Sequence, residues 1–265
     1  MNTLGIDIGG SSVKGAIKAR ADWRTAQSET YSDPTQSDLV AAVRSVIDQL
    51  GLCERAAVCL PGKQADDGNC IEYSKNLPTL NGWAFNELFV ACGLGKTTRV
   101  YSDAVAAGVD FVRTNQLVQR TACISMGTGV GLGVLEDGEP TPLKPCGAAH
   151  LGMIDVGAGM TLESVVGVPA LRARFGDSIR DGIVATDLDD PLIQAVVRMI
   201  GVVREVYEPR GVVLMGGIGI TLAPHKEMIE RLVDKDLGMV ADWSLGFGSS
   251  MFHAAMGAAR LAHDD

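Results

Sequence analysis

The sequence predicts an α/β fold made of two halves that are built alike. Two similar glycine-rich hairpins lie at 5–17 and 123–135, and each opens one half of the chain. Around them, short apolar runs alternate with amphipathic stretches, which is the pattern of strands alternating with helices. The first 60 residues supply three strands, a crossover helix and a parallel strand. The repeated hairpin therefore indicates a duplicated fold.

Composition limits the kinds of protein that this chain can be. It has 265 residues, of which 46% are hydrophobic and 21% charged, and no apolar run is long enough to cross a bilayer. We therefore expect a soluble globular protein with one large domain or two smaller ones. The net charge of −9 and the lack of a Lys/Arg block argue against nucleic acid or an anionic membrane as a partner.

The cysteines and the N-terminus indicate a cytoplasmic protein. Six cysteines are scattered without a C-x-x-C pair, and several lie in apolar segments. This pattern favours buried thiols in a reducing compartment over disulfides or a zinc site. The first two residues lead directly into a predicted strand, without the basic and apolar regions of a secretion signal.

The first hairpin has the features of a phosphate-binding turn. Its first strand carries one acid, Asp7, and the turn consists of Gly9, Gly10, Ser11 and Ser12. Glycine lets the backbone approach a ligand closely, and successive N–H groups beside hydroxyls form a nest for phosphate oxygens. Asp7 lies where an oxygen ligand for Mg²⁺ would be needed. Taken alone, such a sequence is more often only a turn.

The elements that follow complete a first unit. We expect a short third strand at 28–31, an amphipathic helix at 37–50 that ends at Gly51, and a buried strand at 56–60. Residues 61–83 are irregular apart from a short strand at 70–73, and a loop this long, which includes Asn76, is often functional. A short helix at 84–92 and a strand at 99–101 come next.

Ser102 and Asp103 directly follow the strand at 99–101 and open an alanine-rich helix. In the simpler interpretation, Asp103 lies in the first turn and complements the helix dipole. In the other, its carboxylate projects from the end of a strand into a ligand-binding cleft at the edge of a sheet. The spacing alone leaves both open.

The second hairpin repeats the first. An apolar strand from 123 leads into Gly127, Thr128 and Gly129, and an alternating strand continues to 135. One such turn is common, but two, one in each half, indicate a fold that holds a polyphosphate from both sides. The pair therefore predicts nucleotide binding.

The rest of the second half offers fewer candidates. Residues 136–162 are rich in loops, and the polar residues of interest are His150, Asp155 and Glu163, although a lone histidine in a loop is more often solvated than a ligand. We expect a helix from Pro169 onward, a long buried helix at 188–207, a strand at 211–215, a single helix that runs to about 234, and a final helix at 252–262.

Three glycines join the strand at 211–215 to the helix after it: Gly216, Gly217 and Gly219. They permit either close approach of a flat ligand such as an adenine base, or tight packing of the strand against the helix. The sequence leaves these two readings equal.

Together these segments resemble the ROK family of sugar kinases, within the actin, hexokinase and Hsp70 superfamily. Residues 5–17 look like the first phosphate motif of the family, 124–135 like the second, and 212–219 like the adenosine motif. The resemblance covers the whole chain. It implies a two-lobed, actin-like (ribonuclease H-like) ATPase fold with an ATP cleft between the lobes. One lobe would comprise 1–104 and the C-terminal helix 249–265, and the other 105–248.

The resemblance also implies a role for each motif residue. Asp103 would be the general base that takes the proton from a substrate hydroxyl, and Asp7 would orient Mg²⁺, through water. ATP would be held by Asp7 and by residues of the three glycine-rich motifs: Gly9, Gly10, Ser11, Ser12, Gly127, Thr128, Gly129, Gly216, Gly217 and Gly219. The acceptor would contact Asn76, Ser102, Asp103, His150 and Glu163.

The chain departs from the family pattern at the acceptor site. Sugar kinases of the family usually carry Asn-Asp where this chain has Ser102-Asp103, and Gly-x-Gly-Glu-x-Gly-His where it has residues 147–153. His150 then replaces a sugar-binding Glu, and Met153 replaces the His that touches sugar and zinc. The cysteine-rich zinc loop is shortened to 154–162, so no structural zinc is expected. Glu163 still matches the last sugar-contacting Glu of the family.

These departures favour a changed acceptor over an inactive enzyme, because a site that selects by buried hydrogen bonds changes substrate when its partners change. We expect an ATP-dependent kinase of a hexose or hexose-like polyol, such as an amino sugar, a modified sugar or a cyclitol, with glucose not favoured. The alternatives are a kinase-like nucleotide-binding protein with little transfer, polyphosphate as donor and, least favoured, an actin-type filament. The resemblance also suggests a homodimer, and it argues against a repressor, since no helix-turn-helix domain fits before residue 3.

Overall fold

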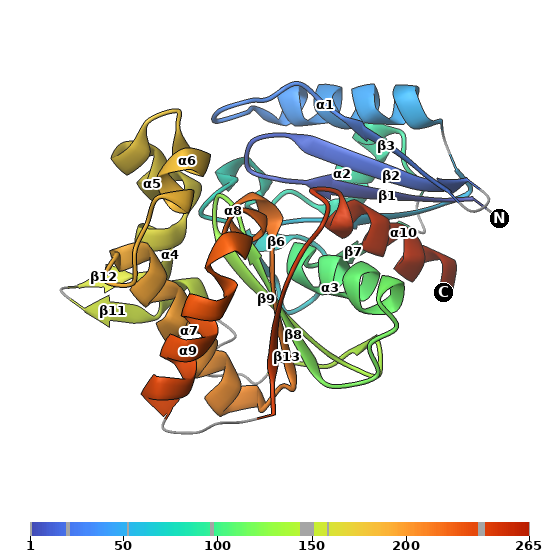
Figure 1. The fold of residues 1–265 in the computed structure, drawn as a ribbon. Coiled ribbons are helices and arrows are strands. Elements are labelled where there is room, and N and C mark those ends of the chain that lie inside the picture. Colours follow the sequence, from blue (N-terminus) through green and yellow to red (C-terminus); the bar gives the residue numbers. More distant parts are fainter. Residues whose placement is uncertain are drawn as a thin grey trace. The chain divides into compact units, whose positions relative to one another are not determined.

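Two five-stranded sheets with the same strand order form the framework of the chain (Figure 1). The computed structural model describes residues 2–19, 22–51, 53–95, 98–143, 151–157, 159–237 and 242–264. The chain divides into two units, of which the first comprises Met1–Asp110 with Phe252–Asp265 and the second Phe111–Met251. The sequence placed these divisions after residues 104 and 248.

The sheet of the first unit begins with an antiparallel meander and continues with two parallel strands. Its order is β3-β2-β1-β4-β7, with β1 at Thr3–Ile8, β2 at Val13–Ala19, β3 at Asp22–Gln27, β4 at Arg55–Cys59 and β7 at Arg99–Tyr101. β1 pairs antiparallel with β2 and parallel with β4. Because β1, β4 and β7 run in the same direction, their carboxyl ends meet at one edge of the sheet.

Two helices cover opposite faces of this sheet. A Cβ on Gly5 would lie 1.9 Å from the carbonyl oxygen of Ala255 in α10 (His253–Asp264), whereas a Cβ on Gly15 would lie 2.3 Å from Val46 in α1 (Gln36–Leu50). Gly15 is paired with Ile6, the neighbour of Gly5, so the two glycines face opposite sides. Figure 1 shows α1 on one side of β1–β3 and α10 on the other.

The helix predicted at 37–50 is confirmed as α1. Thr35 caps its first turn in a reciprocal arrangement with Asp38, and Gly51 ends it with a φ of +92°. Its buried face consists of Leu39, Val43, Val46, Ile47 and Leu50, spaced as one face of a helix requires.

The third strand, in contrast, is not at 28–31. It is β3 at Asp22–Gln27, paired with β2 over its whole length. Only Ala26 of this edge strand is buried, and its sequence DWRTAQ lacks the apolar alternation that marks a half-buried strand. Backbone pairing with β2 decides the position of β3, and the alternation of apolar and polar residues does not reveal this pairing.

The loop-rich stretch of the first unit contains short elements only. They are β5 (Lys63–Gln64), β6 (Ile71–Tyr73), the 3₁₀ turn η1 (Pro78–Leu80) and the helix α2 (Phe85–Cys92). The helix α3 (Asp103–Thr114) then begins directly after β7, as predicted, and runs past Asp110, where the first unit ends.

The sheet of the second unit repeats the first. Its order is β10-β9-β8-β13-β14, with β8 at Thr121–Met126, β9 at Val130–Glu136, β10 at Glu139–Pro140, β13 at Gly211–Met215 and β14 at Ser244–Phe247. Three antiparallel strands are again followed by two parallel ones. The predicted duplicated α/β fold is therefore confirmed.

The helices of the second unit pack around a core whose centre is the long helix α7. They are α4 (Leu162–Val166), α5 (Val168–Phe175), α6 (Ile179–Val184), α7 (Pro191–Tyr207), α8 (Gly216–Thr221) and α9 (Lys226–Leu237), with a hairpin of β11 (Asp155–Gly157) and β12 (Met160–Thr161) before α4. Ten residues of α7 are buried, which agrees with the predicted buried helix.

The single helix expected after β13 is divided into two. α8 begins at Gly216 itself and ends at Thr221, a 3₁₀ turn η3 (Ala223–His225) follows, and α9 begins at Lys226. Pro224 lies in the first turn of η3, where its missing N–H interrupts the helical hydrogen bonds. Pro224 therefore predicts the break, although a single helix was expected here.

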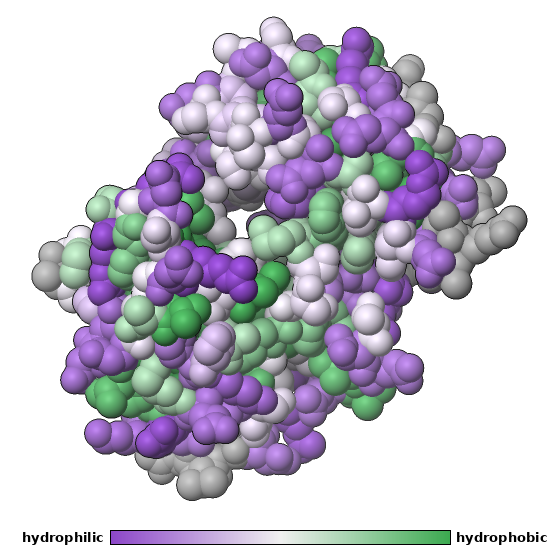
Figure 2. Space-filling model, turned by 45° about the horizontal axis from the view of Figure 1, so that its top comes forward, coloured by the Kyte–Doolittle hydropathy of each residue, from purple (hydrophilic) through white to green (hydrophobic). Residues whose placement is uncertain are grey.

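The described surface is mixed in character. No helix in the described ranges is long and apolar enough to cross a membrane. On the face seen in Figure 2, hydrophilic residues surround separate hydrophobic patches. The large exposed apolar side chains belong to different elements: Tyr73, Val90, Val118, Met153, Met160, Val184, Leu188 and Met251.

Candidate active site

The carboxyl edge of the first sheet brings Asp7 and Asp103 together. Asp7 is the fifth residue of β1 and is paired with Lys14 on β2 and with Cys59 on β4. Cys59 in turn is paired with Tyr101 at the end of β7, two residues before Asp103. The register of the strands thus brings two carboxylates that are 96 residues apart in the sequence to one edge of the sheet.

The charges at this edge influence one another. Burial raises the pKa of Asp7 to about 6, the Lys14 ammonium opposes that rise, and the charge of Asp103 adds to it. The Nζ of Lys14 lies 3.9 Å from Oδ2 of Asp7, and the two side chains are 14% and 13% exposed. Burial and the same two carboxylates also raise the pKa of Cys59. Asp7 and Asp103 are therefore close enough to interact electrostatically.

Asp103 begins α3, and its carboxylate and the hydroxyl of Ser102 both accept hydrogen bonds from N–H groups of the first turn. Its Oδ1 accepts the N–H of Ala104 at 2.8 Å, and the hydroxyl of Ser102 accepts the N–H of Val105 at 3.3 Å. Asp103 is partly buried and Ser102 is exposed. The structure thus shows Asp103 at the start of the helix, where its carboxylate complements the helix dipole, and at the edge that carries Asp7. Its place in a ligand-binding cleft stays a prediction.

The turn after β1 is supported by a residue that the sequence analysis did not identify. Tyr31 donates from its hydroxyl to the carbonyl oxygen of Gly9 at 2.6 Å and from its N–H to the carbonyl oxygen of Ser11 at 2.9 Å. Gly9 also donates to the carbonyl oxygen of Ser12 at 3.0 Å. Within the described residues, the N–H groups of Gly10 and Ser11 donate to no protein acceptor. Such groups can bind the oxygens of an anion.

The position of Lys14 at the site can be predicted from the sequence, whereas that of Tyr31 cannot. A hairpin whose turn spans residues 9–12 places Lys14 opposite Asp7, so counting the pairs would have identified Lys14. Tyr31 follows the strand β3 and reaches the turn through tertiary packing. No sequence pattern indicates that contact.

Asn76 lies in the turn between β6 and η1. It is partly buried and is followed by Leu77, which is fully buried. Asn81, directly after η1, accepts the N–H of Ser74 through Oδ1 at 2.6 Å and so closes this turn. The packing of Leu77 and this hydrogen bond hold the loop that carries Asn76.

The second glycine turn is fixed by the segment after α4. Gly127 donates to the carbonyl oxygen of Gly129 at 3.0 Å and accepts the N–H of Val168 at 2.9 Å. Glu163, in the first turn of α4, accepts the N–H of Val130 through Oε2 at 3.4 Å. Gly127, Thr128, Gly129 and Glu163 are thereby assembled into one region of the second unit.

The three glycines after β13 are accounted for largely by packing. Gly216 has a φ of +74°, and a Cβ on it would lie 2.4 Å from the carbonyl oxygen of Met126. Gly219 is buried, and a Cβ there would lie 2.7 Å from the backbone of Leu214. Gly217 is partly exposed and has only the side chain of Met251 close by. Of the three, Gly217 retains the most room for a ligand.

Of the two remaining residues expected near the acceptor, His150 and Met153, the structure describes only Met153. His150 lies outside the described residues. Met153, which stands where the family carries a sugar- and zinc-binding His, is 63% exposed just before β11. In the described ranges, no three His, Cys, Asp or Glu side chains are grouped so that they could hold a metal ion. The pair of Asp7 and Asp103 does suit Mg²⁺, which binds to one or two carboxylates together with substrate phosphates.

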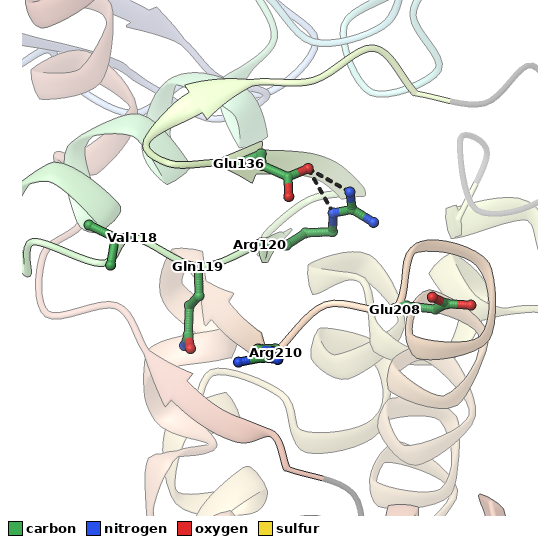
Figure 3. A pocket seen from close by; sticks show the side chains of 6 residues that line it. All are labelled: Val118, Gln119, Arg120, Glu136, Glu208 and Arg210. Atoms are coloured by element: carbon green, nitrogen blue, oxygen red, sulfur yellow. Dashed lines mark hydrogen bonds and ion pairs between the residues drawn. The ribbon is translucent and has the colours of Figure 1, made fainter.

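A hollow of about 330 Å³ lies elsewhere in the second unit (Figure 3). It is lined by Val118, Gln119, Arg120, Glu136, Glu208 and Arg210, and the figure shows Arg120 directed at Glu136, with Nε 3.0 Å from Oε2. Arg120 and Arg210 precede β8 and β13, so the hollow is at the amino ends of these strands. The turn at 127–129 lies at their carboxyl ends, and none of the predicted site residues lines the hollow.

Comparisons with known proteins agree on the family. The ROK family profile matches residues 3–159. The N-acetyl-D-glucosamine kinase of Erwinia tasmaniensis is 24% identical over 274 residues, which cover 86% of this chain and 88% of that protein.

Solved structures agree on the fold. A ROK family glucokinase from Streptomyces griseus, in complex with glucose and AMPPNP, superposes with a TM-score of 0.74 at 17% identity over all of both chains. A ROK family transcriptional regulator, a homologue of the E. coli MLC protein, gives 0.76 at 18% identity over 99% of this chain and 78% of that one. At these identities the likeness shows the two-lobed, actin-like fold that the sequence predicts, and no shared activity.

Proposed function

This chain belongs to the ROK family, and we propose that it is an ATP-dependent kinase that transfers the γ-phosphoryl group to a hydroxyl of a hexose or hexose-like substrate. The observation that carries the proposal is the pair of carboxylates at one edge of the first sheet: Asp7 beside the Gly9–Ser12 turn, and Asp103 at the start of α3. The likeness to an N-acetyl-D-glucosamine kinase supports the class of reaction.

The described residues supply what phosphoryl transfer requires, which is positioning and neutralisation of charge. Asp103 accepts the proton of the attacking hydroxyl as general base. The N–H groups of Gly10 and Ser11, and the turn at 127–129, bind phosphate oxygens. Asp7 would hold Mg²⁺ through water, and the bound cation would supply neutralisation of phosphate charge. Glu163, Ser102 and Asn76 hold the acceptor, together with His150.

The acceptor we propose is an amino sugar, another modified hexose or a cyclitol, with glucose less favoured. Ser102 and Met153 stand where family sugar kinases carry Asn and His, so the polar partners of the acceptor differ. A buried polar group that loses its partner costs about 1–3 kcal/mol, which is enough to exchange one preferred sugar for another. Phosphorylation of glucose as efficient as that of a family glucokinase would contradict this part of the proposal.

A second candidate is a nucleotide-binding protein without efficient transfer. The likeness to a ROK family transcriptional regulator favours it, because a protein with the same fold is there a regulator of transcription. Asp103 separates the two candidates, since a general base is needed only for transfer.

The test is ADP release from Mg-ATP across hexoses, amino sugars, acylated amino sugars and cyclitols. Asp103→Asn keeps the shape of the side chain and removes the base, so the rate should fall by a factor on the order of 10² to 10⁴ without weaker binding of nucleotide. Asp181→Asn is the matched control, because Asp181 is an exposed aspartate in the first turn of α6. ADP release that is equal in Asp103→Asn and wild type would refute the assigned base, and nucleotide binding without any ADP release would favour the second candidate.

A further inference from the structure

The turn at 127–129 is attached at both ends to one short segment, the helix α4 and the two residues after it. At one end, the carbonyl oxygen of Gly127 accepts the N–H of Val168 at 2.9 Å. At the other, the N–H of Val130 donates to Oε2 of Glu163 at 3.4 Å. The residues between these two contacts are the ones assigned to the donor phosphates.

Gly167 makes this attachment sterically possible. A Cβ at this position would lie 2.9 Å from the carbonyl oxygen of Thr128 and 2.7 Å from that of Glu163, and both are backbone atoms. Its φ of −72° and ψ of 151° are open to any residue. Close approach of two carbonyl oxygens, one in α4 and one in the turn, explains the glycine, since its backbone conformation is ordinary.

Glu163 also lies close to Gly152, which leaves room for its carboxylate. A Cβ on Gly152 would lie 3.1 Å from Oε2 of Glu163, so the carboxylate occupies space that a side chain at 152 would need. The helix that carries it is anchored, because Leu162 and Val166 are fully buried. A capping box between Thr161 and Ser164 also fixes its first turn. The backbone of Glu163 is therefore fixed together with α4.

We propose that Glu163 and Gly167 are positioning residues for the nucleotide: they hold the turn at 127–129 in the geometry that binds the donor phosphates. This inference rests on the proposed function, in which Glu163 itself contacts the acceptor. One side chain then touches the acceptor and sets the position of the donor turn. By linkage, a ligand that orders Glu163 strengthens nucleotide binding, and nucleotide strengthens acceptor binding by the same factor.

The test is binding of Mg-AMPPNP to the whole protein, without any acceptor, by titration calorimetry. Glu163→Ala removes the oxygen that Val130 donates to, and Gly167→Ala forces the turn away from α5. Each should weaken binding about tenfold, the equivalent of one lost hydrogen bond. Glu163→Gln keeps an oxygen acceptor at the same place, so it should retain wild-type affinity for Mg-AMPPNP although it loses charge at the acceptor site.

Gly201→Ala is the matched control for Gly167→Ala, because a Cβ at Gly201 in α7 would meet no atom within 4 Å. Circular dichroism of each variant shows that it is folded. Wild-type affinity in Glu163→Ala, or equal losses in Glu163→Gln and Glu163→Ala, would overturn the proposal. If wild-type protein binds no Mg-AMPPNP, the proposed function fails together with it; if wild type binds and transfers phosphate while Glu163→Ala binds equally well, only this inference fails.

Discussion

At the scale of single residues, Asp7 combines two opposed requirements. It lies inside a folded sheet, where burial disfavours charge, and the proposed reaction uses it as a carboxylate near a cation. Lys14, directly opposite on β2, offsets part of this penalty and leaves the pKa at about 6, still above the ordinary value of 3.8. The site therefore stores an electrostatic cost that a bound cation would relieve.

This cost predicts how stability depends on pH in the absence of metal. A carboxyl whose pKa rises from 3.8 to about 6 on folding stabilises the fold when it is protonated, and it loses that contribution as pH rises through 6. The ionised form should cost about 3 kcal/mol at pH 7.5. We expect Asp7→Asn to raise the free energy of unfolding by about that amount at pH 7.5, and to raise it less and less as pH falls from 6 to 4.

Urea unfolding in EDTA at several pH values measures this difference between Asp7→Asn and wild type. If Asp7→Asn raises the free energy of unfolding equally at pH 4.5 and pH 7.5, the burial of charge is not the origin of the stabilisation. The same substitution should remove phosphoryl transfer, which would make Asp7 a residue kept for function at the expense of stability.

At the scale of elements, close packing of α10 shapes the first unit. A Cβ on Gly257 would lie 1.7 Å from the carbonyl oxygen of Ala106 in α3, and a Cβ on Gly5 would lie 1.9 Å from Ala255. The alanine-rich sequence of α10 thus allows a helix to lie directly on β1 and α3. Asp110, which is 1% exposed, joins the same elements by accepting from His253 Nδ1 at 2.6 Å and from Arg260 Nε at 2.7 Å.

The packing predicts opposite effects for two helical glycines. Gly257→Ala places a methyl group against backbone that cannot yield, and it should destabilise the protein by about 3 kcal/mol. Gly201→Ala, in α7 with open space around it, should stabilise by about 0.5–1 kcal/mol because alanine favours the helix. Chemical denaturation of both variants measures the contrast. Equal effects of the two would mean that α10 lies farther from α3 than described.

Several elements were predictable from local pattern, and others were not. The helix at 37–50 and the strands at 99–101 and 211–215 were predicted within a residue or two, since each has strong periodicity or a short apolar run between clear breakers. β3, β14 and α4 were misplaced or missed, because each is short and obtains its stability from pairing or packing with distant segments.

At the scale of the whole molecule, the same strand order occurs twice in one chain. Each unit has three antiparallel strands followed by two parallel ones, and in each the first glycine-rich turn joins the first two strands. The five described cysteines, Cys53, Cys59, Cys70, Cys92 and Cys123, are free thiols. The described part of the fold thus rests on its two hydrophobic cores without a disulfide.

The shortened loop at 154–162 predicts that stability does not depend on zinc. In the described chain this stretch contains the hairpin of β11 and β12 and no cysteine. Protein that is dialysed against EDTA and then returned to Mg²⁺ alone should therefore have the thermal unfolding midpoint of untreated protein, and elemental analysis of the purified protein should find no stoichiometric zinc. Phosphoryl transfer should stop in EDTA and return with Mg²⁺ alone. A midpoint that falls in EDTA and recovers only with zinc would contradict this.

The sequence by itself determined the family, the duplicated α/β plan and the identity of most candidate residues, because glycine-rich turns and apolar runs report local backbone geometry and burial. It did not determine which of these residues meet. Asp7 and Asp103 interact because strand register places the ends of β1 and β7 at one edge. Tyr31 holds the first turn, and Gly167 and Glu163 the second, through contacts between segments 20 or more residues apart. Such contacts depend on tertiary packing, since no local pattern encodes the distance between two segments that fold onto each other.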